Sequence, residues 1–173
     1  MQVVREKIMP GRGIDVAQAA RDFYEPVFRF CARHVGKDLA SDAAQETFLT
    51  AHKVRQNFRG ESSLRTWLFG IALNECRRLA RQKRIEPSTV PLIDVSQQDE
   101  GQSILDRRLL QEALQKLSAE HREVVVLHEI EGLTYEEAAK VLDVPVGTVK
   151  SRLHHAFLQL RRSLDTTYEG ATR

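Results

Sequence analysis

The strongest constraint on the fold is a stretch of about twenty residues, from Ile85 to Ser103, that has no helical periodicity. It contains Pro87 and Pro91 among several Ser, Gln and Asp residues. A structureless connection of that length is uncommon inside one compact domain. Apolar residues on both sides recur with the spacing of helices, and no segment alternates as a strand would. The sequence therefore predicts an all-α protein with two small helical domains joined by a flexible linker. The three segments are residues 15–85, 86–103 and 104–167.

The overall composition is that of a soluble globular protein. Of the 173 residues, 42% are hydrophobic and 29% are charged. No apolar run approaches the roughly 20 residues that a membrane span needs. Residues 1–13 carry basic side chains with no apolar core after them, unlike a secretory signal. We therefore expect a cytoplasmic protein.

Charge is distributed unevenly along the chain. Residues 1–85 contain 16 Lys and Arg against 9 Asp and Glu, a net +7, whereas residues 86–143 contain 5 against 13, a net −8. Residues 144–173 contain 5 against 2, a net +3. Two basic blocks separated by an acidic one favour two separate contacts with polyanions, although solvated charged faces would give the same totals.

The apolar pattern of residues 15–85 predicts three helices. Pro26 is expected to bend or break the first of them. The second is expected to start at Asp42, because Gln45 follows three residues later as in a capping box. The third is expected to start near Ser62 or Ser63. The spacing places Trp67 on its apolar face, which favours a core position over a base-stacking role.

Residues 134–155 have the form of a helix–turn–helix. Thr134 and Glu137 are spaced as a capping box, and a short turn over 143–145 precedes a longer second helix. In such a unit the second helix enters the major groove of DNA. The apolar side of this helix is expected to carry Val149, Leu153, Ala156, Phe157 and Leu160. The other side is expected to present Thr148, Ser151, His154 and His155, flanked by Lys150 and Arg152.

The wording of these segments resembles bacterial sigma factors, most closely the extracytoplasmic-function group. Residues 131–139 (EGLTYEEAA) and 144–153 (VPVGTVKSRL) are similar to the promoter-binding C-terminal domain of that family. Residues 42–49 (DAAQETFL) resemble its polymerase-clamp-binding helix, and 58–68 (FRGESSLRTWL), continuing to Asn74, resemble the segment that captures the melted promoter strand. The resemblance covers about residues 20–165. It implies a transcription initiation factor that binds core RNA polymerase, directs it to promoters, assists promoter opening and is regulated by an anti-sigma protein.

The resemblance also implies three sets of binding residues. The polymerase-binding set is Asp42, Gln45, Glu46 and Phe48. The set for the minus-ten element is Arg59, Gly60, Ser62, Ser63, Asn74, Arg77 and Arg78. The set for the minus-thirty-five element is Thr134, Tyr135, Thr148, Lys150, Ser151, Arg152, His154 and His155. Helix capping is the alternative role for Asp42, Gln45 and Thr134, and a core position is the alternative for Phe48.

Two positions depart from the usual pattern of that family. Asp143 stands in the turn where Gly is frequent, and Asp tolerates a left-handed backbone better than most residues. His155 stands where Arg is common. A neutral imidazole cannot make the bidentate guanine contact that Arg makes, so the family pattern does not define the exact promoter sequence that this chain reads.

Catalytic and metal chemistry find little support. The chain has no His-Glu-x-x-His, no glycine-rich phosphate loop and no nucleophile elbow, which argues against an enzyme. Cys31 and Cys76 form no Cys-x-x-Cys pair and are expected to be buried thiols. His154 and His155 are adjacent on a helix and point about 100° apart, which disfavours a metal site. No cofactor is expected.

Two other kinds of protein remain to be weighed. A stand-alone helix–turn–helix repressor or activator would bind duplex operator as a dimer, without polymerase. It would leave the segments at 42–49 and 58–68 without a purpose. A purely structural helical adaptor would not need the basic faces.

Overall fold

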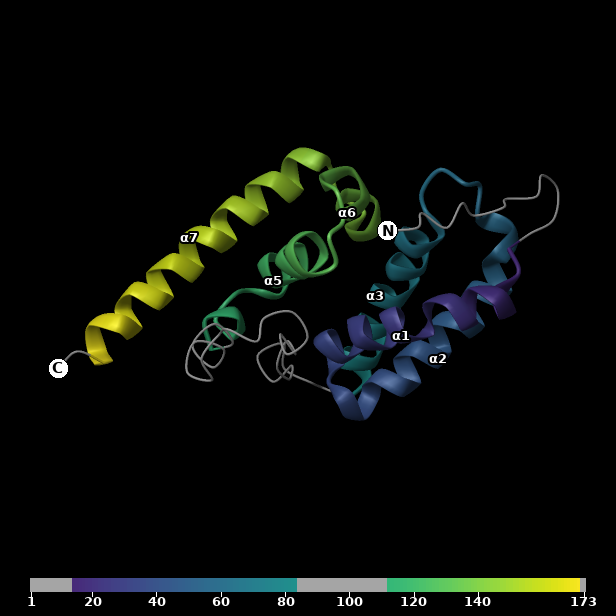
Figure 1. The fold of residues 1–173 in the computed structure, drawn as a ribbon, viewed down its shortest axis with the longest axis horizontal. Coiled ribbons are helices and arrows are strands. Elements are labelled where there is room, and N and C mark those ends of the chain that lie inside the picture. The colour runs from purple at the N-terminus through teal and green to yellow at the C-terminus, as the bar shows by residue number, and fades with distance from the viewer. Residues whose placement is uncertain (1–13, 84–111, 172–173) are drawn as a thin grey trace.

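The structure is a computed structural model that describes residues 14–83 and 112–171, with the backbone alone from residue 165 onward. Every regular element in these ranges is helical and none is a strand, which confirms the predicted all-α class. Figure 1 shows two groups of helices, one from each half of the chain. The predicted linker over 86–103 lies outside the described residues. The helices are α1 (Val16–Val35), α2 (Lys37–Val54), α3 (Leu64–Gln82), α5 (Ala119–Val125), α6 (Tyr135–Leu142) and α7 (Val146–Ala171).

The N-terminal domain is a bundle of α1, α2 and α3. Its core consists of large apolar side chains, and Phe30, Leu68 and Phe69 have no solvent exposure. The rings of Phe30 on α1 and Phe69 on α3 stack with their centroids 4.6 Å apart. Burial of each such side chain contributes about 1.5–3 kcal/mol. The thiols of Cys31 and Cys76 lie in the same core, at 0% and 2% exposure, as predicted.

Gly36 sets the junction between α1 and α2. Its φ of 87° is a left-handed conformation that favours glycine, so α1 ends and α2 begins at this residue. The predicted helix start at Asp42 is therefore wrong, because Asp42 lies exposed inside α2. The predicted break at Pro26 is also absent, since α1 continues through it as one helix.

The start of α3 follows the sequence prediction. The Ser63 hydroxyl accepts a hydrogen bond from the backbone N–H of Thr66 at 3.0 Å, which caps the helix. Trp67 is half-buried and packs against the core, with its ring centroid 5.4 Å from that of Phe58. The short 3₁₀ turn η1 (Arg55–Asn57) precedes the loop that leads to Ser63.

Within the described residues, the C-terminal domain begins with a helical stretch over 112–115, which is followed by α5 and its π-helical continuation η3 (Val126–Ile130). Ser118 caps α5 by accepting from the N–H of His121 at 3.3 Å. The segment ends at Gly132, whose φ of 67° turns the chain toward α6. Ser118 and Gly132 thus mark the two ends of this segment.

The helix–turn–helix is present with the predicted local chemistry. Thr134 and Glu137 form a complete capping box at the start of α6. Asp143 has φ 55° and ψ 51° in the turn, and among the described residues it alone combines a positive φ with a side chain. Phe157 on α7 is 46% exposed, so the prediction that it belongs to the apolar side of that helix is wrong.

His34, near the C-terminal end of α1, is a half-buried histidine whose ring has one hydrogen-bond partner among the described residues. Its Nδ1 lies 2.8 Å from the carbonyl oxygen of Phe30, and its Nε2 is buried with no partner among the described residues. Burial lowers the pKa of His34 from its usual value, and the charges of Arg77 and Arg33 act in the same direction. The Phe30 carbonyl and the carboxylate of Glu123 act in the opposite direction but do not prevail.

We expect His34 to make the protein less stable in mild acid. Because its pKa is lower in the folded state, its neutral form contributes stability above the unfolded pKa of about 6.5, and this contribution is lost as pH falls below that value. Thermal unfolding of the wild type and of His34→Gln is compared at about pH 7.5 and about pH 5.5. The melting temperature of the variant should fall less than that of the wild type when the pH is lowered from the first value to the second. His52→Gln, on the exposed face of α2, is the matched control and should behave as the wild type. Equal losses in all three proteins would contradict the argument.

Thr134 should contribute measurably to the stability of the C-terminal domain. Thr134→Ala removes the hydroxyl that accepts from the N–H of Glu137, and loss of such a cap costs about 1 kcal/mol. Urea unfolding measures the free energy of unfolding of the wild type, Thr134→Ala and Thr134→Ser. Serine keeps the hydroxyl and should unfold close to the wild type. The capping argument fails if serine is as destabilised as alanine.

Candidate nucleic-acid interface

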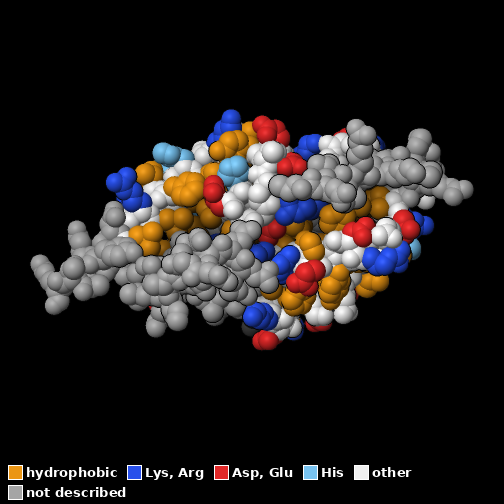
Figure 2. Space-filling model, in the orientation of Figure 1, with side chains coloured by type: hydrophobic (Ala, Val, Ile, Leu, Met, Phe, Trp, Pro, Cys, Tyr) orange, Lys and Arg blue, Asp and Glu red, His pale blue; other side chains and the backbone are white. Residues whose placement is uncertain are grey.

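The first half of α7 presents a polar face on a helix whose other face is buried. Val149, Leu153 and Ala156 are buried against the rest of the C-terminal domain. The residues between them therefore point to solvent. Figure 2 shows histidine and basic side chains gathered over α7. On α7, the exposed members of the predicted duplex-binding set are Lys150, Ser151, His154 and His155.

Several of these side chains already have partners inside the domain. The Lys150 ammonium lies 5.4 Å from the ring centroid of Tyr135, a cation–π contact that joins α7 to the start of α6. The Ser151 hydroxyl donates to the carbonyl oxygen of Thr148 at 3.1 Å. Arg152 pairs with Glu120 of α5 at 2.9 Å. Arg152 is thus held beside α5, whereas Lys150 and Ser151 keep their polar ends at the surface.

The start of α6 lies next to this face. The Tyr135 ring stacks on that of His128, with centroids 4.4 Å apart. The hydroxyl of Thr134 is engaged in the capping box, so its structural role is established by geometry. The rings of His121 and His155 approach to 6.3 Å between α5 and α7. The structure therefore brings the predicted residues of α6 and α7 onto one surface.

The predicted minus-ten residues fall into two groups, one in the loop before α3 and one within that helix. Arg59, Gly60 and Ser62 lie in the loop before the helix, and Ser63 is its N-cap. The second group lies at the other end, where Asn74 is exposed. Fourteen residues of helix separate Ser63 from Arg77, a distance of about 21 Å along the axis. A single small pocket cannot include both groups.

Arg77 and Arg78 are both occupied by carboxylates. Arg77 donates from Nε and a terminal nitrogen to the two carboxylate oxygens of Glu123 on α5, at 3.1 Å and 2.6 Å. This bidentate bond raises the pKa of Arg77 and holds its charge. Arg78 pairs with Glu75 at 2.7 Å and lies 4.0 Å from Glu46 of α2. Arg77 therefore contacts the opposite domain, whereas the partners of Arg78 are in its own.

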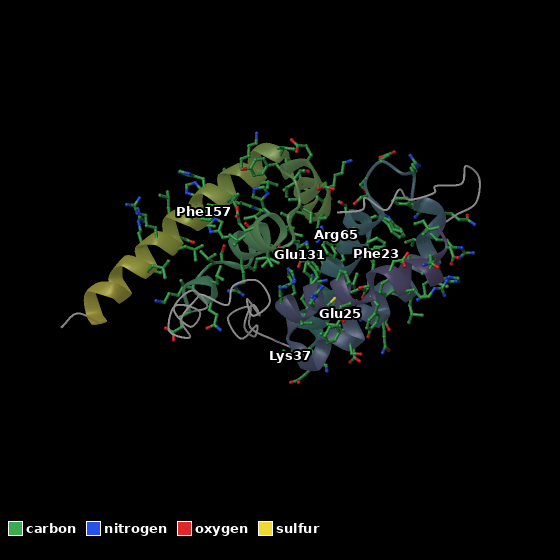
Figure 3. All side chains as sticks on the ribbon, in the orientation of Figure 1. Phe23, Glu25, Lys37, Arg65, Glu131 and Phe157 are labelled. Carbon is green, nitrogen blue, oxygen red and sulfur yellow. The ribbon has the colours of Figure 1, made fainter. Side chains whose placement is uncertain are left out.

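Two arginines that sequence reasoning missed meet at one glutamate. Glu131, in the turn after η3, accepts from Arg33 of α1 and from Arg65 of α3, the latter at 3.0 Å. Arg65 also donates to the Glu131 carbonyl at 2.8 Å and lies 4.7 Å over the ring of Phe69. Figure 3 shows Arg65 and Glu131 adjacent where the domains meet. Burial raises the pKa of Glu131, against the lowering effect of Arg33 and Arg65.

Further contacts between the domains continue toward the start of α3. The Thr66 hydroxyl donates to Glu137 of the capping box at 3.0 Å. The Lys140 ammonium, on α6, donates to the carbonyl oxygen of Glu61 in the loop before α3. The C-terminal domain therefore lies along α3 from that loop to Arg77. The sequence feature related to this arrangement is the opposite charge of residues 1–85 and 86–143.

The predicted polymerase-binding residues lie on α2. Asp42 and Gln45 are exposed and Glu46 is half-buried. Phe48 is only 8% exposed and its ring lies 6.1 Å from that of Tyr24, so it is mainly a core residue. Leu49 beside it is 53% exposed, an apolar surface residue that the sequence analysis did not select.

The described ranges contain neither a candidate metal centre nor a helix able to span a membrane. In residues 14–83 and 112–171, no group of three or more His, Cys, Asp or Glu is arranged to hold a metal ion. Among the helices of the same ranges, none combines the length and the apolar character needed to cross a membrane.

Comparison with known proteins identifies both domains. The family model for sigma-70 region 2 matches residues 19–85, and the model for sigma-70 region 4 matches residues 107–160. The RNA polymerase sigma factor YlaC of Bacillus subtilis is 32% identical over 158 residues, covering 86% of this chain and 91% of its own. The ECF RNA polymerase sigma-E factor of Escherichia coli is 28% identical over 187 residues, covering 99% and 96%.

A solved structure agrees with these matches. The sigma factor RpoE from Bartonella quintana, in complex with the anti-sigma factor NepR, is 29% identical and covers 87% of this chain and 97% of its own, with a TM-score of 0.65. Sigma factors are transcription initiation factors and not enzymes. The chain belongs to the sigma-70 family of RNA polymerase sigma factors, as a member of the extracytoplasmic-function group.

Proposed function

We propose that this chain binds core RNA polymerase, directs it to promoters and helps to open them, with one domain for each promoter element. The domain of residues 15–85 binds the polymerase clamp and the minus-ten element, and the domain of residues 104–167 binds the minus-thirty-five element. Residues 86–103 link them. The observation that carries this proposal is the match of sigma-70 regions 2 and 4 to separate helical domains of one chain. A stand-alone repressor accounts for the second match only.

In this proposal α7 reads the minus-thirty-five element as duplex DNA. Lys150, Ser151 and His154 project from the face of α7 opposite its buried side, which is the geometry of a recognition helix in the major groove. His155, Thr148 and Arg152 flank this face. Arg152 is paired with Glu120 in the structure and binds a phosphate in place of that carboxylate when DNA is present. Thr134 and Tyr135 meet the phosphate backbone at the start of α6, where the helix dipole favours anions.

The minus-ten element is bound along α3 as an unpaired strand. Reading a base requires that it leave the stack, so the protein must supply a loop that receives the base and cations that hold the backbone. Arg59, Gly60, Ser62 and Ser63 supply the loop. Asn74, Arg77 and Arg78 hold the strand at the other end of α3. The two groups are far enough apart to contact several successive nucleotides.

The clamp of core polymerase is bound by α2. Asp42, Gln45 and Glu46 provide a polar, acidic surface for basic groups of the polymerase. Phe48 supports that surface from beneath through its stack with Tyr24.

The chain is placed in the cytoplasm, where transcription takes place, and its regulator is an anti-sigma protein. The latter is supported by the similar RpoE of Bartonella quintana, which forms a complex with the anti-sigma factor NepR.

Run-off transcription tests the proposal. Purified core polymerase is incubated with a genomic promoter library, with and without this chain. Specific transcripts that appear only when the chain is added support the proposal, and their aligned start sites give both promoter elements. If core polymerase is unaffected while the chain alone retains duplex DNA, the repressor function takes its place.

Lys150 provides a residue-level prediction. Lys150→Ala should weaken binding to a promoter duplex recovered in the run-off experiment and reduce the salt slope of that affinity by about one. Fluorescence anisotropy over a range of salt concentrations measures both effects. Lys37→Ala removes the same charge from the start of α2, which Figure 3 places far from α7, and should leave both unchanged. Equal effects of the two substitutions would contradict a contact specific to α7.

A further inference from the structure

The carboxylates of the C-terminal domain occupy the cations of the N-terminal domain. Glu123 binds Arg77 through two hydrogen bonds, and Glu131 binds both Arg33 and Arg65. The side chains of these glutamates are only 11% and 7% exposed, so both carboxylates are nearly enclosed. The negative charge of the C-terminal domain is thus placed directly on the basic surface of α1 and α3.

The geometry of these pairs is one that a phosphate would share. A guanidinium presents a planar fork of donors that binds a carboxylate or a phosphate in the same two-bonded manner. Arg77 makes that fork with Glu123. Each glutamate oxygen therefore stands where a phosphate oxygen of a nucleic-acid strand would accept the same hydrogen bonds.

The positions of these pairs along α3 coincide with those proposed for the promoter strand. Arg77 is at the far end of α3, Arg65 is in its first turn, and the loop before the helix is held by Lys140 through the Glu61 carbonyl. A strand that followed α3 from the loop to Arg77 would meet the C-terminal domain along its whole path. The strand and the C-terminal domain cannot occupy this surface together.

We propose that Glu123 and Glu131 are internal competitors of the promoter strand, and that Arg33, Arg65 and Arg77 form one phosphate-binding surface that either the C-terminal domain or single-stranded DNA occupies. The proposal rests on the function proposed above for α3, and it adds Arg33 and Arg65 to the residues that bind the strand. In the arrangement seen here the chain is closed, and its affinity for the unpaired strand is reduced until the domains separate.

The polar character of the contacts makes this exchange feasible. Each arginine that loses a glutamate on opening gains a phosphate, so no charge is left buried and unpaired. Removal of one partner alone would leave such a charge, which is the costly outcome for enclosed ion pairs. The competition therefore replaces one set of charge-assisted hydrogen bonds by another.

The test compares Glu123→Gln/Glu131→Gln with the wild type in the full chain. Glutamine keeps the size of each side chain and removes its charge. The affinity for a fluorescent, mixed-sequence single strand of about twenty nucleotides should rise about tenfold, within the usual range of coupling between sites. The radius of gyration of the free protein, from small-angle X-ray scattering, should increase because the closed form is weakened.

A matched control separates competition from net charge. Glu129→Gln/Glu136→Gln removes the same two charges from exposed positions of the same domain that do not contact the arginines. Its affinity for the single strand should rise much less than that of the first variant. Equal affinities in the two double variants would overturn the proposal, because the gain would then come from net charge alone.

A second measurement uses the wild type and does not depend on the folding of any variant. Coupling between strand binding and domain separation is reciprocal. Saturation with the single strand must therefore open the chain and increase the radius of gyration by more than the added strand alone would. A complex in which the domains stay as close as in the free protein would overturn the proposal. Failure of the sigma-factor function itself is recognised separately, by the absence of run-off transcripts with the wild type and core polymerase.

Discussion

Glu131 is the residue on which the arrangement of the two domains most depends. It follows η3 directly, so its position is fixed by a helical segment whose Leu127 is fully buried. Its side chain ties the end of α1 to the start of α3, and its carbonyl oxygen accepts from Arg65 as well. A carboxylate this enclosed is tolerated because cations surround it, and burial still raises its pKa against the opposing effect of Arg33 and Arg65.

The helix–turn–helix depends on backbone constraints of a different kind. Gly132, Thr134 and Asp143 each resolve a helix terminus, by a left-handed turn, a capping box and a left-handed aspartate. Of the three, Asp143 lies between α6 and α7, so its left-handed backbone sets the turn between these helices and with it the direction in which Lys150 and Ser151 point. Since Glu137 of the capping box also accepts from Thr66, the same residue joins the local geometry of α6 to the contact between domains.

The sequence was sufficient wherever the cause of a structure is local. The caps at Ser63 and Thr134 follow from side-chain chemistry within three or four residues, and the structure has both of them. The error at Asp42 arose because a capping pattern inside a helix looks the same as one at its start. Gly36, whose backbone conformation decides the boundary, lies outside that pattern.

The contacts between domains could not be predicted in this way. Arg33 and Glu131 are 98 positions apart, and Arg77 and Glu123 are 46 apart. Nothing local distinguishes them from other charged residues on helix surfaces. The opposite net charges of residues 1–85 and 86–143 indicated that such pairs were possible, but a sum of charges does not say which arginine meets which glutamate. For this reason the sequence indicates Arg77 as a DNA-binding residue but does not indicate its partner Glu123, and it does not single out Arg33 or Arg65.

Local chemistry and the contacts between domains are linked through the arginine side chain. A guanidinium does not distinguish a carboxylate from a phosphate by shape. In the proposed competition the two acceptors differ mainly in their effective concentration at the arginines. Glu123 and Glu131 have a high effective concentration at these arginines because they belong to the same chain, whereas a promoter strand must bind from solution. A strand wins this competition once many phosphates act together, or once a second contact holds the domains apart. The contacts proposed for α2 with polymerase and for α7 with duplex DNA are of that kind, and with them promoter opening and domain separation would become one coupled equilibrium.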